Sequence, residues 1–348
     1  KGIRGFDIDM AYEGLRKNHM PGGMMSRSGY EHKTAKGGNV EDYITMGYVP
    51  YPNPRGRFGG HEQGAGQTLE YSYQDWTLAQ LALALGKKED AYIFLTRSKN
   101  YKNLYDAQSG WIRPKNVDGE WANPFDPYNY AKGYVEANGA QFTWFVPHDI
   151  GGLAALMGGK EKAAARLNEQ FEQAEKLGFT SGTSHSVETH PEYRRIPINY
   201  GNQPSIQTAY IFNYLDRPDL TQYWSRKVLD AAFSGLSPES GFNGDEDQGL
   251  MGSLAVLMKL GLFQMNAGTE ENPIYELGSP IFDKAVIHLN EEYYPGKSIT
   301  IEAENNGPTN YYLSQKSFNG QTIKGIGVRH EDLIKGGLIK LQMSSKSK

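Results

Sequence analysis

The sequence is organised around the stretch Gly241-Phe242-Asn243-Gly244-Asp245-Glu246-Asp247-Gln248-Gly249, in which three consecutive acids stand between glycines. An apolar run from Leu250 to Leu262 follows at once. Because glycine readily adopts the backbone angles of tight turns, the pattern predicts an acidic turn that opens a helix. The acids can cap that helix, since first-turn carboxylates satisfy free N–H groups and oppose the helix dipole. They can equally bind a cation or activate a water molecule, and the rest of the chain must decide between these roles.

Helical periodicity occurs in pairs of segments along most of the chain. The apolar spacing predicts helices over about residues 6–17, 68–86, 89–105, 145–157, 161–177, 205–215, 220–233 and 248–263. Short links join the two helices of a pair, whereas long loops at 24–66, 106–140 and 178–203 separate the pairs. Loops of this length in a compact domain usually carry function. The asymmetry predicts a mainly α fold, a helical toroid whose long loops gather at one mouth.

The character of the sequence changes after Gly268. Residues 298–303 and 337–343 alternate between apolar and polar, and Asn319-Gly320 is a hairpin signal. We therefore expect two domains, a helical toroid over 1–268 and a small β-rich segment over 269–348. A β segment this small does not bury a sheet face alone, so we expect it to pack against another part of the protein.

Composition excludes several classes of function. The chain has 348 residues, and 40 acids against 36 bases give a net charge of -4, which argues against a nucleic-acid partner. It has no cysteine, so disulfides and thiol catalysis are excluded. No apolar run approaches the roughly 20 residues of a membrane span. The 41 Gly, 23 Tyr and 5 Trp suit loops that stack sugar faces, although a Tyr-rich core explains them too.

Two of the long loops carry a candidate carboxylate just before a helix. Glu70, with Asp75, opens the predicted helix at 68–86, and a solvated charge is the simpler explanation of Glu70. Glu136 lies among aromatic and apolar residues, an environment that raises the pKa of a carboxyl group toward the range of a general acid. A helix-capping role explains Glu136 equally well.

Two further groupings offer oxygen ligands. Tyr200-Gly201-Asn202-Gln203-Pro204-Ser205 supplies side-chain amides and carbonyls, the hard donors that Ca²⁺ takes, although plain capping by Ser205 is a simpler alternative. The acids at 245–247 do not have the spacing of an EF-hand. Neither His148 nor His185 has a partner at metal-ligand spacing, so we expect no zinc site.

Glu136 and the acids at 245–247 are the best pair for two-carboxylate chemistry. Glycoside hydrolysis with inversion uses one protonated acid at the leaving oxygen and one ionised base behind a water molecule. For that reaction the two carboxyl groups should lie roughly 6.5–9.5 Å apart.

Several motifs in order resemble glycoside hydrolase family 92 across about residues 1–340. They are Thr68–Trp76, Arg97–Tyr101, Asn123–Pro127, Glu136–Asn138, Phe142–Asp149, Gly201–Pro204, Phe212–Tyr214, Arg217–Gln222, Gly244–Gly249 and Tyr275–Pro280. That family consists of calcium-dependent, inverting exo-α-mannosidases that are usually bacterial and exported. Its architecture is an N-terminal β-sandwich followed by an (α/α)6 toroid. The resemblance implies an (α/α)6 toroid that is incomplete in this chain, and a secreted or periplasmic protein acting on mannose-containing oligosaccharides or glycoprotein glycans.

The resemblance also assigns roles to residues. It implies Glu136 as the general acid, and Asp247 as the general base with Asp245 as its companion. Ca²⁺ is implied as the cofactor, bound around Asn202 and Gln203 and contacting mannose O2 and O3. The residues that we expect to bind substrate are Glu70, Trp144, Tyr200 and Gly201.

Two departures from the family pattern bear on specificity. Gln203 stands where the family often has Glu, and Tyr200-Gly201 stands where members specific for α-1,2 linkages tend to have His-Glu. The second departure argues against α-1,2 specificity and leaves α-1,3, α-1,4, α-1,6 or a modified mannose open. The family's N-terminal β-sandwich and first toroid helices are expected as a missing part of the same protein. We therefore expect the catalytic toroid over 1–268 to be truncated at its N-terminus, and the β-rich segment over 269–348 to pack on the missing sandwich. Two alternatives stay open, an inverting glycosidase for another sugar and a non-catalytic carbohydrate-binding toroid.

Overall fold

The computed structural model describes residues 5–23, 39–52, 63–180, 195–237, 240–241, 244, 247 and 249–347. These residues form two compact units. The N-terminal unit comprises the described residues of Gly2–Met157 and His190–Pro197, and the C-terminal unit comprises those of Gly158–Thr189 and Ile198–Lys348.

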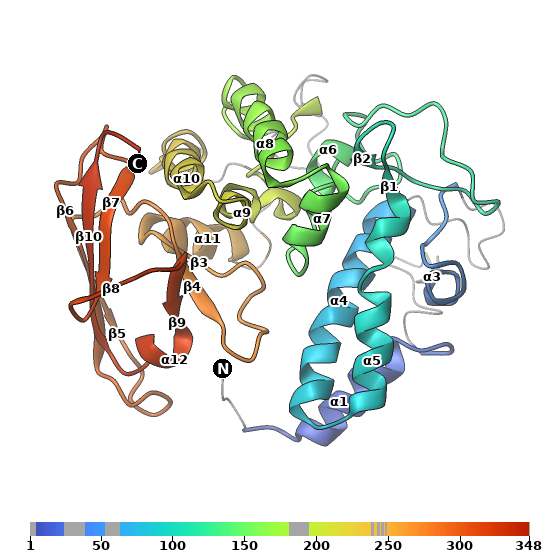
Figure 1. Cartoon of the computed structure of the whole chain (residues 1–348), viewed down its shortest axis with the longest axis horizontal. Coiled ribbons are helices and arrows are strands. Elements are labelled where there is room, and N and C mark those ends of the chain that lie inside the picture. The colour runs from blue at the N-terminus through green and yellow to red at the C-terminus, as the bar shows by residue number, and fades with distance from the viewer. Residues whose placement is uncertain are drawn as a thin grey trace. The chain divides into compact units, whose positions relative to one another are not determined.

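The N-terminal unit is built on two long helices that run side by side (Figure 1). Its helices are α1 (Ile8–Asn18), α3 (Val40–Met46), α4 (Gly64–Ala84), α5 (Lys88–Arg97), α6 (Gly139–Phe142) and α7 (Ile150–Leu156), with a 3₁₀ turn η1 (Asn100–Leu104) and a short ribbon of β1 (Tyr105–Asp106) and β2 (Trp111–Ile112). Gly86 takes a φ of 71° in the link between α4 and α5, which suits a residue without Cβ. Small side chains at Ala79, Ala82 and Ala91 let the two helices approach around Phe94.

The helices of the C-terminal unit surround an aromatic core. They are α8 (Lys160–Glu175), the 3₁₀ turn η3 (Gln203–Ser205), α9 (Thr208–Tyr214), α10 (Pro218–Ala232) and α11 (Leu250–Lys259). Phe171 of α8 stacks on Trp224 of α10 with ring centroids 5.1 Å apart, and Phe212 of α9 lies 5.6 Å from Phe171. Pro218 begins α10 because its missing N–H has no partner to lose in a first turn.

Two sheets complete the C-terminal unit. The strands are β3 (Leu262–Phe263), β4 (Ile274–Leu277), β5 (Lys284–His288), β6 (Ser298–Glu304), β7 (Tyr312–Phe318), β8 (Gln321–Thr322), β9 (Gly327–Arg329) and β10 (Gly337–Ser344), with the short helix α12 (His330–Leu333) between the last two. One sheet has the order β5-β6-β10-β7-β8 and the other β3-β4-β9. Ile301, Ile339 and Leu341 on the larger sheet pack with Leu277 and Val328 on the smaller one. The apolar face of the larger sheet is therefore covered within this unit.

The structure confirms most predicted elements and corrects some boundaries. The strands at 298–303 and 337–343 and the Asn319-Gly320 turn are confirmed as β6, β10 and the β7–β8 hairpin. The single helix predicted over 145–157 is wrong, because α7 begins only at Ile150, where Asp149 accepts a hydrogen bond from the Gly152 N–H. The helix at 89–105 ends at Arg97 and continues as η1, and residues 262–263 form a strand rather than the end of a helix. The predicted loop at 24–66 contains α3.

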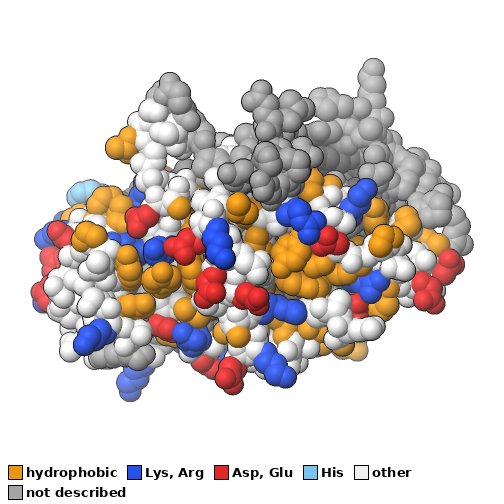
Figure 2. Space-filling view, turned by 90° about the horizontal axis from the view of Figure 1, so that it is seen from above, with side chains coloured by type: hydrophobic (Ala, Val, Ile, Leu, Met, Phe, Trp, Pro, Cys, Tyr) orange, Lys and Arg blue, Asp and Glu red, His pale blue; other side chains and the backbone are white. Residues whose placement is uncertain are grey.

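Some predictions about architecture stay predictions. They are the closure of the helices into an (α/α)6 toroid and the division of the chain at residue 268. In the described parts of the chain, none of the helices combines the length and the apolar character needed to cross a membrane. Acidic and basic side chains are mixed over the described part of the face shown in Figure 2.

Candidate active site

Glu136 sits in a loop that holds its backbone in an uncommon conformation. Its φ is 48°, in the left-handed region that residues other than glycine rarely adopt, and its side chain is half-buried. Hydrogen bonds on both sides hold the loop in place. The Tyr134 hydroxyl donates to the Ile112 carbonyl at 2.5 Å, and the Ala131 N–H donates to the Ala137 carbonyl at 2.8 Å. Because such conformations persist where the surroundings enforce them, and because they cluster at functional sites, this loop remains a strong candidate.

Helix α4 supports the Glu136 loop through a glycine. The Gly66 N–H donates to the Gly133 carbonyl at 3.0 Å, and a Cβ on Gly66 would lie 3.2 Å from the Val135 nitrogen. Glu70 follows Gly66 by one helical turn, so the two residues share a face of α4. Burial raises the pKa of the half-buried Glu70 carboxyl to about 7. The face of α4 that packs on the Glu136 loop therefore also carries Glu70.

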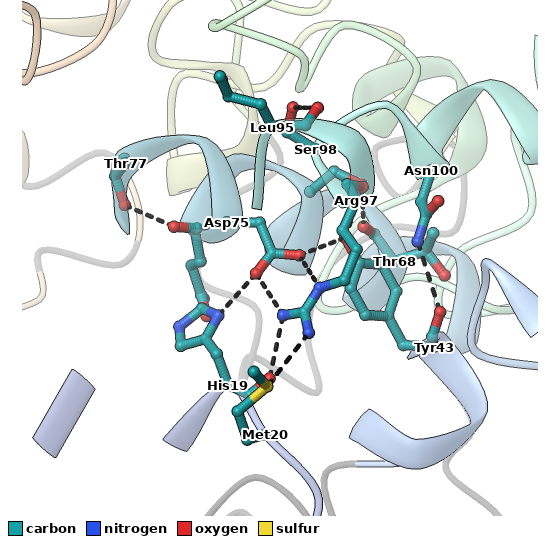
Figure 3. A network of polar contacts seen from close by, with 12 residues as sticks. His19, Met20, Tyr43, Thr68, Asp75, Thr77, Leu95, Arg97, Ser98 and Asn100 are labelled. Carbon is teal, nitrogen blue, oxygen red and sulfur yellow. Dashed lines mark hydrogen bonds and ion pairs between the residues drawn. The ribbon is translucent and has the colours of Figure 1, made fainter. Parts of the chain in front are cut away.

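A buried polar network holds α4 at Asp75, later in the same helix than Glu70 (Figure 3). Asp75 is fully buried on α4 and accepts from Arg97 Nε at 2.8 Å and from Arg97 Nη2 at 2.5 Å. The Tyr43 hydroxyl donates to the same carboxylate at 3.0 Å, and His19 Nδ1 lies 3.0 Å from it. The network joins α1, α3, α4 and α5. Asp75, which the sequence placed beside Glu70 in one grouping, thus has a structural role.

Trp144 and Tyr200 are buried within their own units. Trp144 is 1% exposed in the N-terminal unit, and Tyr200 is 0% exposed in the C-terminal unit. The Tyr200 hydroxyl accepts from the Ala209 N–H at 3.0 Å, and the backbone N–H of Tyr200 donates to the Phe179 carbonyl at 2.7 Å. Direct contact of either ring with a sugar stays a prediction.

The segment Tyr200–Gln203, which we call the amide loop, runs directly into η3. Asn202 caps this turn, because its Oδ1 accepts from the Gln203 N–H at 2.8 Å, and Pro204 stands in the first turn. The Gly201 N–H donates to Asn199 Oδ1 at 2.9 Å. These contacts leave the Gln203 side chain projecting from a rigid turn.

The acidic turn docks on the amide loop through a second glycine. A Cβ on Gly244 would lie 2.1 Å from the Gly201 carbonyl oxygen, so only glycine fits at this position. Asp247, which is exposed and has a φ of 43°, accepts a hydrogen bond at Oδ2 from the Gln203 side-chain amide. Among the described residues, no side chain caps α11 at its N-cap, Gly249. The Asp247 carboxylate is thus paired with the amide loop, whereas Asp245 lies outside the described residues.

The donor atoms at this junction suit a hard cation. The Gln203 amide contacts the Asp247 carboxylate through its nitrogen, and each side chain also carries oxygen, the ligand atom that Ca²⁺ prefers. Within the described residues, no group of three His, Asp or Glu side chains is placed to hold a metal. Because Asp245 and Glu246 of the same turn lie outside the described residues, a calcium site around Asn202 and Gln203 stays a prediction.

The structure thus brings some of the predicted residues together. Tyr200, Gly201, Asn202 and Gln203 share the C-terminal unit with Asp247, which Gln203 contacts, and Glu70 shares the N-terminal unit with Glu136. The separation of the Glu136 and Asp247 carboxyl groups, which belong to different units, stays a prediction. The sequence marked Gly244 as a glycine of the acidic turn but not as a point of close backbone approach, and it did not single out Gly66, although a glycine one turn before Glu70 was the available signal.

Solved structures that resemble this chain include α-mannosidases. One is a family 92 α-mannosidase of Bacteroides thetaiotaomicron in complex with mannoimidazole, with 27% identity and a TM-score of 0.81 over 99% of this chain and 42% of that protein. Another is a family 92 inverting mannosidase of the same organism, with 29% identity and a TM-score of 0.79 over 99% of this chain and 44% of that protein. An uncharacterized secreted glycosidase of Arthroderma benhamiae is 25% identical over 89% of this chain and 39% of its own length.

The model of the glycosyl hydrolase family 92 catalytic domain matches residues 1–345. The chain belongs to this family. It spans well under half the length of the relatives named above, 39% to 44% of each.

Proposed function

We propose that the protein containing this chain is an inverting, calcium-dependent exo-α-mannosidase that removes terminal mannose from glycans. The observation that carries the proposal is the docking of the acidic turn on the amide loop, in a chain that belongs to family 92. Family membership and the mannosidase neighbours support the sugar and the reaction class. The exposed Asp247 carboxylate, held by Gln203, supports a base that reaches solvent.

In the proposed reaction, Glu136 gives its proton to the departing glycosidic oxygen while the bond from that oxygen to the anomeric carbon breaks. A water molecule forms the new bond to the same carbon from the opposite face, and Asp247 takes the proton that this water loses. Because the Gln203 side-chain N–H donates to Oδ2 of Asp247, Oδ1 of Asp247 is the oxygen that receives the proton. The product has inverted anomeric configuration because a single displacement occurs.

Calcium would be held by oxygens at Asn202 and Gln203, with the acids of the turn close by. When bound it supplies positive charge to the mannose O2 and O3 hydroxyls. Gln203 then has two roles, because its amide nitrogen orients Asp247 while its oxygen is available to the cation.

The proposed substrate is a mannose-containing oligosaccharide or glycoprotein glycan with a linkage other than α-1,2. The small Gly201 and the buried Tyr200 support this linkage preference, since neither offers an exposed polar side chain to the neighbouring sugar. We further propose that the protein is secreted or periplasmic and that an N-terminal β-sandwich belongs to the same protein. The A. benhamiae relative, described as secreted, supports that location.

The proposal is tested in the full-length protein with Glu136→Gln and Asp247→Asn, using Glu120→Gln, an exposed acid of the 106–140 loop, as the matched control. Loss of the acid or the base should lower kcat on α-mannosides by about 10²- to 10⁴-fold. NMR of the first-formed product should show β-mannose. Unchanged turnover in both variants, hydrolysis of another sugar in preference, or mannoside binding without turnover would contradict the proposal.

A further inference from the structure

The motif Tyr275–Pro280 has no part in the proposed chemistry, yet it carries a fully buried carboxyl group. Glu276 lies on β4, and none of its surface is exposed. Gly278 of the same motif lies close to α9, since a Cβ on this glycine would be 2.8 Å from the Tyr210 hydroxyl. The motif therefore joins β4 to α9.

The two oxygens of Glu276 have unequal partners. Oε1 accepts from the Tyr214 hydroxyl at 2.8 Å and from the Met265 N–H at 3.1 Å. Oε2 faces the Asn213 carboxamide, whose nitrogen lies at 3.4 Å, a long contact for a hydrogen bond. The oxygen of the same carboxamide is buried and has no hydrogen-bond partner among the described residues. One carboxyl oxygen is thus saturated by donors, while the other lies beside an amide whose acceptor is unused.

Among the residues that the structure describes, the groups around Glu276 include no cation. Helix α9 contributes Tyr210, Asn213 and Tyr214, and the neighbouring strands contribute Phe263 and Gly327 at the paired positions. The negative charge of Glu270, in the segment after β3, repels an ionised Glu276 and so raises its pKa. Burial is the largest influence, and with Glu270 it outweighs the three donors and raises the pKa of Glu276 to about 7.

We infer that Glu276 keeps its proton on Oε2 below neutral pH and donates it to the Asn213 carboxamide oxygen, forming a pH-sensitive latch between β4 and α9. Turning the Asn213 carboxamide presents its oxygen to Oε2. The proton then replaces a long amide contact with an O–H···O hydrogen bond and gives the unused acceptor a partner, while the Asn213 nitrogen takes the position that its oxygen held. Ionisation removes this bond and leaves a buried charge without a cation, which is costly in a low-dielectric interior.

The latch acts on the candidate site through α9. The far end of this seven-residue helix binds the Tyr200 hydroxyl through the Ala209 N–H, and Tyr200 begins the amide loop. Glu276 is therefore a positioning residue for the amide loop, a consequence that rests on the proposed function. The protonation of Glu276 itself does not rest on it.

The test compares the full-length protein with its Glu276→Gln variant, which mimics the neutral acid. A buried acid whose folded pKa is raised stabilises the fold below its unfolded pKa, and this contribution is lost as pH rises through the folded value. The melting temperature of the variant should therefore increase by several degrees relative to that of the wild type as the pH rises from about 4.5 to 7. Above about pH 7 the difference should stay constant. The matched control is Glu291→Gln, an exposed acid of the same unit, which should show no such trend. A Glu276→Gln difference that is flat with pH would overturn the latch.

Two further measurements keep the inference testable if the variant folds poorly. Titration of the Glu276 side-chain carbon by NMR in the wild type should show the protonated form persisting to neutral pH, and a carboxyl that is ionised at pH 6 would overturn the inference. In the enzyme assay, KM should rise on the alkaline side in the wild type and not in Glu276→Gln. Absence of any mannosidase activity would refute the proposed function while the unfolding and NMR results still decide the latch.

Discussion

Single residues at the candidate site show conformations that local sequence preference does not favour. Glu136 and Asp247 both have a positive φ, at 48° and 43°. A residue with a Cβ pays a steric cost in this region, so the surrounding contacts must impose it. For Glu136 these contacts are identifiable, because Tyr134 and Ala137 on either side are tied to Ile112 and Ala131.

Glu70 gives a prediction at the same scale. Burial raises the pKa of its carboxyl from 4.5 to about 7, so its contribution to folding stability is present below about pH 4.5 and is lost as pH rises through 7. The urea midpoint of Glu70→Gln should therefore rise relative to the midpoint of the wild type as the pH increases from about 4.5 to 7. Because Glu70 and Glu276 lie in different units, the double variant should show both trends. A Glu70→Gln midpoint that follows the wild type at every pH would contradict the prediction.

At the scale of elements, the acidic turn and the amide loop form one structure. Gly244 meets the Gly201 backbone so closely that a Cβ would lie 2.1 Å from the carbonyl oxygen and 2.5 Å from Cα. Backbone atoms cannot rotate away as a side chain can, so any larger residue must separate the two segments.

Gly244→Ala should therefore act on Asp247 at a distance. We expect a fall in kcat of at least tenfold, since a displacement of about 1 Å at a catalytic group can cost roughly a hundredfold. Gly325→Ala in the same unit has open space around its Cβ and serves as the control in the same mannoside assay. Equal activity of the two variants would show that the docking does not matter for the reaction.

The buried network around Asp75 gives a prediction about stability. Asp75→Asn breaks a buried carboxylate–guanidinium pair and leaves Arg97 without its counter-ion, which costs about 3–5 kcal/mol. Asp90→Asn breaks the more exposed pair with Arg16 and should cost at most about 1 kcal/mol. Free energies of unfolding from urea titrations separate the two, and a similar small cost for both would contradict a central role for the Asp75 network.

At the scale of the whole molecule, the proposed reaction needs groups from both compact units. Glu70 and Glu136 belong to the N-terminal unit, while the amide loop and Asp247 belong to the C-terminal unit. A cation at the amide loop can be detected without turnover, because a ligand that binds only the folded state raises the melting temperature.

Calcium should therefore raise the melting temperature of the full-length protein, and EDTA should reverse the shift and lower mannosidase activity. Gln203→Met keeps the length of the side chain but removes its oxygen, so the calcium-induced shift should shrink or vanish. Gln315→Met, at an exposed position on β7, should keep the full shift. An undiminished shift in Gln203→Met would remove this residue from the calcium site.

Much of the local structure could be predicted from the sequence because it depends on near neighbours. Helical spacing indicated α4, α8 and α10, and alternation indicated β6 and β10. The errors lie where tertiary contacts override local pattern. Apolar spacing continued through 145–149, yet Asp149 is held as an N-cap and accepts from the Tyr101 hydroxyl at 2.7 Å, so α7 starts late.

The sequence by itself determined the family, the main helices with strands β6 and β10, and the residue types available for two-carboxylate chemistry. Only the tertiary structure decided that Asp247 pairs with Gln203, that Gly66 and Gly244 allow backbone segments to touch, and that Glu276 is buried beside an unused acceptor. The physical reason is that these features depend on groups far apart in the sequence. A side chain's burial and hydrogen-bond partners, and hence its pKa, follow from which distant segments pack around it.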